Sequence, residues 1–191
     1  MEGRSFRGLV LVGFMGSGKS SVGREIAGRL RVEFVDLDER IERTAGKSVR
    51  EIFAERGEPA FREMERAAIR EAVTVPGRVI ATGGGAFEDP ENRRRLKGYA
   101  PVVFLDVTAE AVLARIPDAR SRPLLRGDSP EGRQEIANRM RERRPAYEQA
   151  DWSVSTDGVS VSEVAGRILA WIGTGAVPGP ARDIPSGEAS G

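Results

Sequence analysis

The sequence contains no cysteine and no histidine. Without cysteine there is no disulfide framework, no thiol nucleophile and no cysteine-ligated metal. Without histidine the chain lacks the usual general base near neutral pH and the commonest metal ligand in proteins. A carboxylate is therefore the best remaining candidate for accepting a proton in any reaction that the protein catalyses.

A surplus of positive charge is also lacking. The chain has 30 basic and 29 acidic residues, a net charge of +1, and its only lysines are Lys19, Lys47 and Lys97. Binding to bulk nucleic acid or to a membrane surface needs a positive surplus, so we expect neither partner. Most of the cationic side chains are arginines, which suit planar, bidentate recognition of carboxylate and phosphate.

Long apolar runs are missing as well. No run approaches the roughly 20 residues of a membrane span. The first residues, "MEGRSFRGLVLVGF", reach glycines where a secretory signal needs a longer apolar stretch. We therefore expect a cytoplasmic protein, and we expect it to be a monomer. A single domain is predicted over residues 1–172, because 39% of the residues are hydrophobic and can form one core. Residues 173–191, rich in Gly, Pro, Ala and Ser, are predicted to be a disordered tail.

Short apolar segments alternate with amphipathic ones along the chain. Five segments read as buried strands, namely 9–14, 32–38, 78–84, 102–107 and 151–156. Between and after them, apolar residues at helical spacing predict helices at 20–30, 61–73, 92–97, 109–115, 132–148 and 160–172. This alternation predicts an α/β fold with three α-β-α layers around a five-stranded parallel sheet.

The stretch "GFMGSGKS" at 13–20 matches the phosphate-loop pattern G-x-x-x-x-G-K-[ST] and lies between a predicted strand and a predicted helix. Glycines let backbone N–H groups surround an anion, and the helix N-terminus adds partial positive charge. Lys19 would reach the β- and γ-phosphates of a nucleotide, and the Ser20 hydroxyl would ligate Mg²⁺. The second "GKS", at 46–48, has Ile41 six residues before Lys47 and no preceding strand. It is predicted to be a turn between helices.

Two motifs follow other predicted strands, where ligands bind in open parallel sheets. In "DLD", Asp36 and Asp38 share a face if the strand continues; a solvated strand end or a helix cap is the alternative. "TGGG", Thr82 to Gly85, indicates a ligand close to the backbone, or else a flexible turn. Arg62 and Glu65, three apart on a predicted helix, form either a functional pair or an ordinary exposed one. "RIPDARSRPLL" at 115–125 reads as a loop that brings arginines over phosphates, or as a solvated charged loop.

Taken together, these motifs resemble the shikimate kinases, a family of the nucleoside-monophosphate-kinase-like phosphate-loop folds. The similar stretches are "GFMGSGKSSVG", "FVDLD", "IFAERGEPAFREME", "VIATGGGAF", "RPLL" and "RRPAYEQAD", in the family's order. The resemblance implies ATP-dependent phosphorylation of the 3-hydroxyl of shikimate, a step toward chorismate and the aromatic amino acids. It also implies substrate-binding helices over about 38–75 and a lid over about 115–127.

On the acceptor side the resemblance implies that Asp38 binds the ring hydroxyls of shikimate beside the attacking oxygen. Arg62 and Arg143 would hold the substrate carboxylate, and Gly84 and Gly85 would make backbone contacts. Arg143 is chosen over its neighbouring arginines because the family's arginine stands four residues before a tyrosine, here Tyr147. Glu65 would orient Arg62.

On the nucleotide side the resemblance implies that Asp36 helps to hold Mg²⁺ through water, together with the Ser20 hydroxyl. Arg115 would lie against adenine, and Arg122 would meet the transferring phosphates. The catalytic residues would be Lys19, Asp38 and Arg122. The implied ATP-binding set is Gly16, Ser17, Gly18, Lys19, Ser20, Ser21, Arg115 and Arg122. The segment "TDGVSVSEV" after the fifth strand departs from the family's adenine loop and leaves preference for ATP over GTP open.

Two other functions compete with this interpretation. One is a kinase of similar build that acts on gluconate or a nucleoside monophosphate. The other is a binding module that changes partners with its nucleotide state and does no small-molecule chemistry. "DLD" together with "GE-x-x-FR-x-x-E" favours shikimate over the first, and the composition of the site argues against the second.

Overall fold

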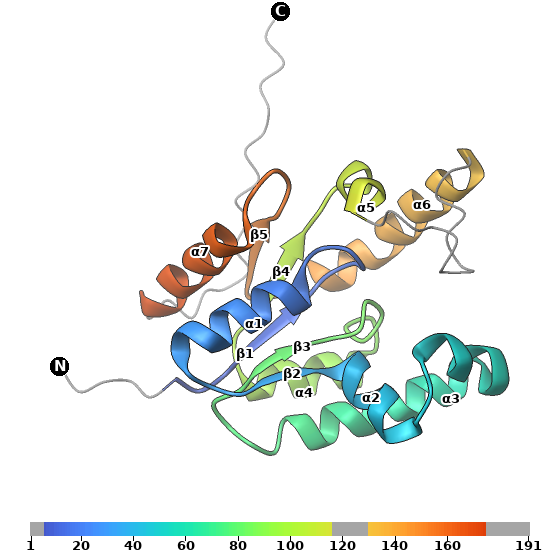
Figure 1. The fold of residues 1–191 in the computed structure, drawn as a ribbon, viewed down its shortest axis with the longest axis horizontal. Coiled ribbons are helices and arrows are strands. Elements are labelled where there is room, and N and C mark those ends of the chain that lie inside the picture. The colour runs from blue at the N-terminus through green and yellow to red at the C-terminus, as the bar shows by residue number, and fades with distance from the viewer. Residues whose placement is uncertain (1–5, 116–129, 175–191) are drawn as a thin grey trace, which may run out of the picture.

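The structure is a computed structural model that describes residues 6–115 and 130–174, with Pro130 and Glu131 described by their backbone alone. Strands and helices alternate for most of its length (Figure 1). In chain order they are β1 (Leu9–Val12), α1 (Lys19–Leu30), β2 (Phe34–Asp36), α2 (Leu37–Ala45), α3 (Val49–Ala72), β3 (Val79–Ala81), α4 (Pro90–Tyr99), β4 (Val102–Asp106), α5 (Ala109–Arg115), α6 (Pro130–Tyr147), β5 (Trp152–Ser155) and α7 (Val161–Gly173).

The five strands form one parallel sheet in the order β2-β3-β1-β4-β5. β1 is central: Val10 pairs with Ile80 of β3 on one side and with Val102 of β4 on the other. Because the chain moves to opposite sides of β1, the strand order reverses there. Ligands bind at such a point, beyond the carboxyl ends of the strands.

Both faces of the sheet are covered by helices (Figure 1). Leu9 and Leu11 of β1 pack against α1 and α7, whereas Val10 and Val12 belong to a second core with α3, α4 and α6. Burial on both faces explains why the strands read as continuous apolar runs. The predicted three-layer α/β fold with a five-stranded parallel sheet is confirmed.

The predicted second strand, 32–38, is too long. β2 ends at Asp36, and Asp38 lies in the first turn of α2, so the two carboxylates do not share a strand face. The cause is local: Asp36 Oδ1 accepts hydrogen bonds from the N–H groups of Asp38 and Glu39 and caps the helix. The helix-cap alternative for "DLD" therefore holds for Asp36.

The second "GKS" is a turn between helices, as predicted. Gly46 ends α2 in a left-handed conformation, and Ser48 begins α3 with a capping box formed with Glu51. Lys47 forms an ion pair with Glu55 instead of facing a phosphate loop.

The helix predicted over 61–73 is only the later part of α3, which begins at Val49. Helix α3 consists of two segments. Gly57, with φ 75° and ψ 172°, interrupts it, and Pro59 opens the second segment. A Phe53–Phe61 contact, with ring centroids 4.6 Å apart, joins the two segments. The interruption sets the direction of the second segment, which carries Arg62 and Glu65.

Parts of two predicted regions lie outside the described residues: the lid beyond Arg115, which includes Arg122, and the tail beyond Thr174. Gly173, the first residue assigned to the tail, is the last residue of α7. Among the described helices, none combines the length and apolar character needed to cross a bilayer.

Two glycines of α1 should respond in opposite ways to alanine. At Gly23 a Cβ would lie 2.3 Å from Cε2 of Phe34, whereas at the exposed Gly28 it would meet nothing within 4 Å. We expect Gly23→Ala to lower the free energy of unfolding by about 1–3 kcal/mol through overpacking. Gly28→Ala should raise it by about 0.5–1 kcal/mol because alanine favours the helix. Urea unfolding of both variants measures this, and equal shifts would contradict the packing of α1 on β2.

Candidate active site

The phosphate-loop pattern lies between β1 and α1 at the centre of the sheet. Gly13, Gly16 and Gly18 have φ values of 143°, 75° and 92°, which side-chain-bearing residues rarely adopt. A Cβ on Gly13 would also lie 2.6 Å from the Leu105 carbonyl oxygen. Lys19 Nζ donates to the carbonyl oxygens of Gly13 and Phe14, at 2.8 Å each, so its ammonium group lies on the loop itself.

The other two serines assigned to ATP differ in exposure. Ser17 is 1% exposed, and its hydroxyl oxygen has no hydrogen-bond partner among the described residues. Ser21, in the first turn of α1, is exposed. A buried hydroxyl without a partner is costly, so Ser17 is suited to meet a ligand atom or an ordered water.

Ser20 and Asp36 are brought together as the sequence predicts for a metal site. The Ser20 hydroxyl donates to Asp36 Oδ2 at 2.6 Å. A hydroxyl and one carboxylate are hard oxygen donors of the kind Mg²⁺ uses beside phosphates and water. Within residues 6–115 and 130–174 there is no group of three or more acidic side chains that could hold a metal alone. The donors therefore fit a magnesium ion that shares its coordination with nucleotide phosphates.

The predicted acceptor residues converge on the glycine loop after β3. A Cβ on Gly83 would lie 2.7 Å from Asp38 Oδ1, and one on Gly85 would lie 2.6 Å from Nη2 of Arg62. At Gly84 it would lie 3.3 Å from Nη1 of Arg143. The three predicted acceptor side chains, from α2, α3 and α6, thus occupy the space beside three successive glycines.

The same loop touches the phosphate loop. A Cβ on Gly84 would lie 3.6 Å from the backbone nitrogen of Met15 and 3.9 Å from the carbonyl oxygen of Gly13. The predicted acceptor residues and the backbone of the phosphate-loop pattern therefore line two sides of one site.

Arg62 is held by two carboxylates on its own helix. Its Nη1 donates to Glu65 Oε2 at 2.9 Å, and its Nε and Nη2 donate to Glu58 Oε1 at 3.2 and 2.8 Å. Burial lowers the pKa of Arg62, but Glu65 and Glu58 outweigh burial and the pKa is raised. These bonds use three of the five N–H donors of a guanidinium, which leaves two for a further anion.

Glu65 is 1% exposed, and burial is the main reason why its pKa is raised. Arg62 and Arg143 act in the opposite direction, whereas the nearby Asp38 carboxylate raises the pKa further. A Cβ on Gly83 would lie 3.0 Å from Glu65 Oε1 and 2.7 Å from Asp38 Oδ1. The Arg62–Glu65 pair is therefore a buried part of the site, and the exposed-pair alternative is wrong.

Helix α6 presents adjacent arginines to different places. The Arg143 guanidinium lies 5.7 Å from the Phe14 ring centroid and beside Gly84. Arg144 pairs instead with Asp106 and Glu148. With Arg141 it lines a cavity of about 510 Å³ between α5, α6 and the ends of β4 and β5, which Phe14 and Tyr147 also line. This geometry agrees with the choice of Arg143 for the acceptor.

Tyr147 contacts the glycine loop from the same helix, because its hydroxyl donates to the Gly84 carbonyl oxygen. Burial raises the pKa of Tyr147, so the phenol stays protonated and remains a donor. The tyrosine used above as a spacing marker is thus itself a structural support of Gly84.

Arg115 lies at the nucleotide side. Its Nη1 donates to the carbonyl oxygen of Gly16 at 3.2 Å and to the Thr156 hydroxyl at 3.0 Å, and its Nη2 donates to the Thr156 carbonyl. It therefore bridges the phosphate loop and the segment after β5. Arg122 lies outside the described residues.

Comparison with known proteins gives the family of the chain. The sequence model of the family described as shikimate kinase matches residues 15–173. The chain belongs to the shikimate kinase family. This confirms the resemblance, whereas the roles of individual residues stay predictions.

Two curated relatives are shikimate kinases of similar length. That of Persephonella marina is 42% identical over 166 residues, which cover 85% of this chain and 99% of the relative. That of Geobacter sulfurreducens is 45% identical over 167 residues, 87% of this chain and 91% of the relative. A solved shikimate kinase from Acinetobacter baumannii, in complex with shikimate, superposes with a TM-score of 0.84 and 34% identity over 90% of this chain and 95% of that one.

The predicted site residues did not include Gly83, Glu58 or Thr156, which the structure places beside Asp38, Arg62 and Arg115. Gly83 belongs to the triple glycine, and Glu58 lies four residues before Arg62, so both carried a signal. Thr156 begins "TDGVSVSEV", the stretch compared above with the family's adenine loop, but only tertiary folding brings it to Arg115.

The raised pKa of Glu65 has a consequence for stability. A carboxyl whose folded pKa exceeds its unfolded value, about 4.3, binds more protons in the folded state, so its contribution to stability falls as pH rises. We expect the unfolding free energy of the wild type, relative to Glu65→Gln, to fall between pH 4 and pH 7. Urea unfolding at several pH values measures this difference. A difference that grows with pH would show that Arg62 outweighs burial.

Proposed function

We propose that this chain transfers the γ-phosphoryl group of ATP to the 3-hydroxyl of shikimate. The observation that carries the proposal is the convergence of Asp38, Arg62 and Arg143 on a glycine loop that abuts the phosphate loop. A carboxylate and two guanidinium groups beside a phosphate loop suit a small molecule with hydroxyls and one carboxylate. Membership of the shikimate kinase family supports the same reaction.

In the proposed step the substrate hydroxyl oxygen bonds to the γ-phosphorus as the bond from that phosphorus to the β–γ bridging oxygen breaks. The hydroxyl proton passes to the Asp38 carboxylate, and ADP leaves. Phosphoryl transfer requires alignment and neutralisation of charge more than strong base catalysis. We therefore assign Asp38 mainly to orienting the hydroxyl and to accepting the proton late.

Positive charge at the phosphates is assigned to Lys19 and to Arg122, which lies outside the described residues. We propose that Ser20, with Asp36 acting through water, holds Mg²⁺; when bound, the ion neutralises phosphate charge and fixes phosphate geometry. Arg115 is assigned to adenine because it bridges Gly16 and Thr156. A monomer in the cytoplasm, with one kinase domain over residues 1–172, remains our prediction for the protein as a whole.

Specificity should come from the two guanidinium groups. Arg143 is 16% exposed and Arg62 is 23% exposed, so both are partly withdrawn from water. Binding a substrate without a carboxylate would leave their remaining donors poorly satisfied, which is costly. The site should therefore reject neutral analogues strongly.

A coupled ADP-release assay tests the function. We expect shikimate to stimulate ADP formation, with kcat/KM at least about a hundredfold lower for its methyl ester, for gluconate and for AMP. Release of ADP that no small hydroxy acid accelerates would instead indicate a nucleotide-dependent binding module.

Adjacent arginines on α6 provide a matched pair of variants. Arg143→Ala should raise the KM for shikimate by about 10-fold to 100-fold, as expected for a lost charge-assisted hydrogen bond. Arg144→Ala removes the same charge from the pair with Asp106 and should change this KM by less than about threefold. Steady-state kinetics with saturating ATP measures both. A larger effect at Arg144 would reverse the assignment.

A further inference from the structure

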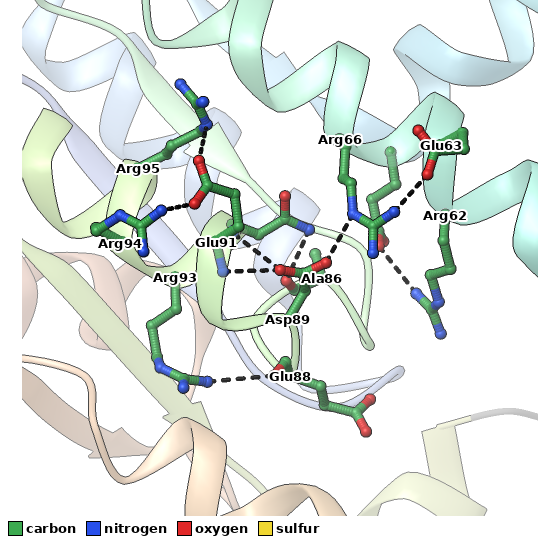
Figure 2. Close-up of polar contacts among 12 residues, drawn as sticks. Arg62, Glu63, Arg66, Ala86, Glu88, Asp89, Glu91, Arg93, Arg94 and Arg95 are labelled. Carbon is green, nitrogen blue, oxygen red and sulfur yellow. Dashed lines mark hydrogen bonds and ion pairs between the residues drawn. The ribbon is translucent and has the colours of Figure 1, made fainter.

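Two acidic residues follow the glycine loop directly. Glu88 and Asp89 lie in the turn between Gly85 and α4, where the N–H of Glu88 donates to the Gly85 carbonyl oxygen at 3.1 Å. The two residues before them, Ala86 and Phe87, are fully buried and fix this turn in the core. The carboxylates of Glu88 and Asp89 point away from each other (Figure 2).

Glu88 reaches α6. Its Oε1 lies 2.8 Å from Nε of Arg143. Because the contact is with Nε, the outer edge of the guanidinium, with Nη1 beside Gly84, remains directed toward the acceptor side.

Asp89 reaches α3. Its Oδ2 accepts from Nε of Arg66 at 2.8 Å, one helical turn beyond Arg62 (Figure 2). Its Oδ1 accepts from the N–H of Glu91 at 2.8 Å and from that of Asn92 at 3.3 Å, and so caps α4. The pair with Arg66 holds the pKa of Asp89 low although burial alone would raise it. One carboxylate thus ties α3 to the start of α4.

We propose that Glu88 and Asp89 form an acidic bracket that positions the two acceptor arginines relative to the glycine loop. Glu88 orients Arg143 directly, and Asp89 holds the segment of α3 that carries Arg62. Neither touches the reacting groups, so both are positioning residues. This inference rests on the proposed function, because it assigns the bracket to recognition of the substrate carboxylate.

Whether removal of Glu88 strengthens or weakens shikimate binding distinguishes a positioning role from simple electrostatic repulsion. Glu88 is an anion near the place assigned to the substrate carboxylate, so by Coulomb repulsion alone its removal should strengthen substrate binding. If Glu88 orients Arg143, its removal frees a long side chain that must be ordered again on binding, and binding weakens. Glu88 is 42% exposed, so its ion pair should add little to fold stability.

Steady-state kinetics of Glu88→Ala and Glu88→Gln tests whether Glu88 positions Arg143. We expect the KM for shikimate to rise about threefold to tenfold in Glu88→Ala, and less in Glu88→Gln, because an amide oxygen can still accept from Nε. The KM for ATP and the melting temperature should stay near the wild-type values. Glu91→Ala is the matched control, since Glu91 pairs with Arg94 and Arg95 on α4 and should leave both KM values unchanged.

Asp89→Asn tests whether Asp89 holds the segment of α3 that carries Arg62. Asparagine keeps the helix cap but loses the charge that Arg66 meets. We expect Asp89→Asn and Arg66→Gln to raise the KM for shikimate about twofold to fivefold, and the double variant to do no more than either alone.

Shikimate methyl ester, tested as a competitive inhibitor, provides the last readout. Its inhibition constant should not change in Glu88→Ala, since the ester carries no carboxylate for Arg143 to meet. A KM for shikimate that stays constant or falls in both Glu88 variants overturns the bracket, as does an equal rise in the KM for ATP. If the wild type fails to phosphorylate shikimate, the proposed function fails instead, so the two failures are distinguishable.

Discussion

The site depends on one constraint: no side chain is present at Gly83, Gly84 or Gly85. The oxygen and nitrogen atoms of Asp38 and Arg62 lie 2.6–2.7 Å from where a Cβ would be, closer than any packed Cβ tolerates. A side chain at Gly83 or Gly85 would therefore require the Asp38 carboxylate or the Arg62 guanidinium to shift. Glycine loses more conformational entropy on folding than other residues do. Here it permits a close approach of side chains to the backbone that no other residue would allow.

Strand order explains why this loop is the meeting point. β3 lies between β1 and β2, so the loop after it faces the phosphate loop on one side and the start of α2 on the other. In a parallel sheet all carboxyl ends share one edge, which brings the ends of three strands to the same place. Asp36 adds a second consequence, because by capping α2 it ends β2 and places Asp38 beside Gly83.

The contacts of Arg62 and Arg143 explain why arginine suits the side of the site that we assign to the acceptor. Arg62 and Arg143 are each held by carboxylates through some of their N–H groups, and the remaining N–H groups stay available as donors. The donors of a lysine ammonium all lie on one nitrogen atom, so they are less easily divided between positioning and binding. The buried partner, Glu65, carries a desolvation cost that the exposed partners, Glu58 and Glu88, do not.

The sequence alone determined the alternation of strands and helices, the three layers and the identity of the first "GKS", because each depends on short-range patterns of apolar residues and glycines. Tertiary structure alone decided that Arg144 pairs with Asp106, that Tyr147 meets the Gly84 carbonyl and that Glu88 meets Arg143. These contacts join residues between 38 and 63 positions apart in the sequence. Short-range sequence patterns do not predict such contacts, because the contacts form only when the helices pack on the sheet.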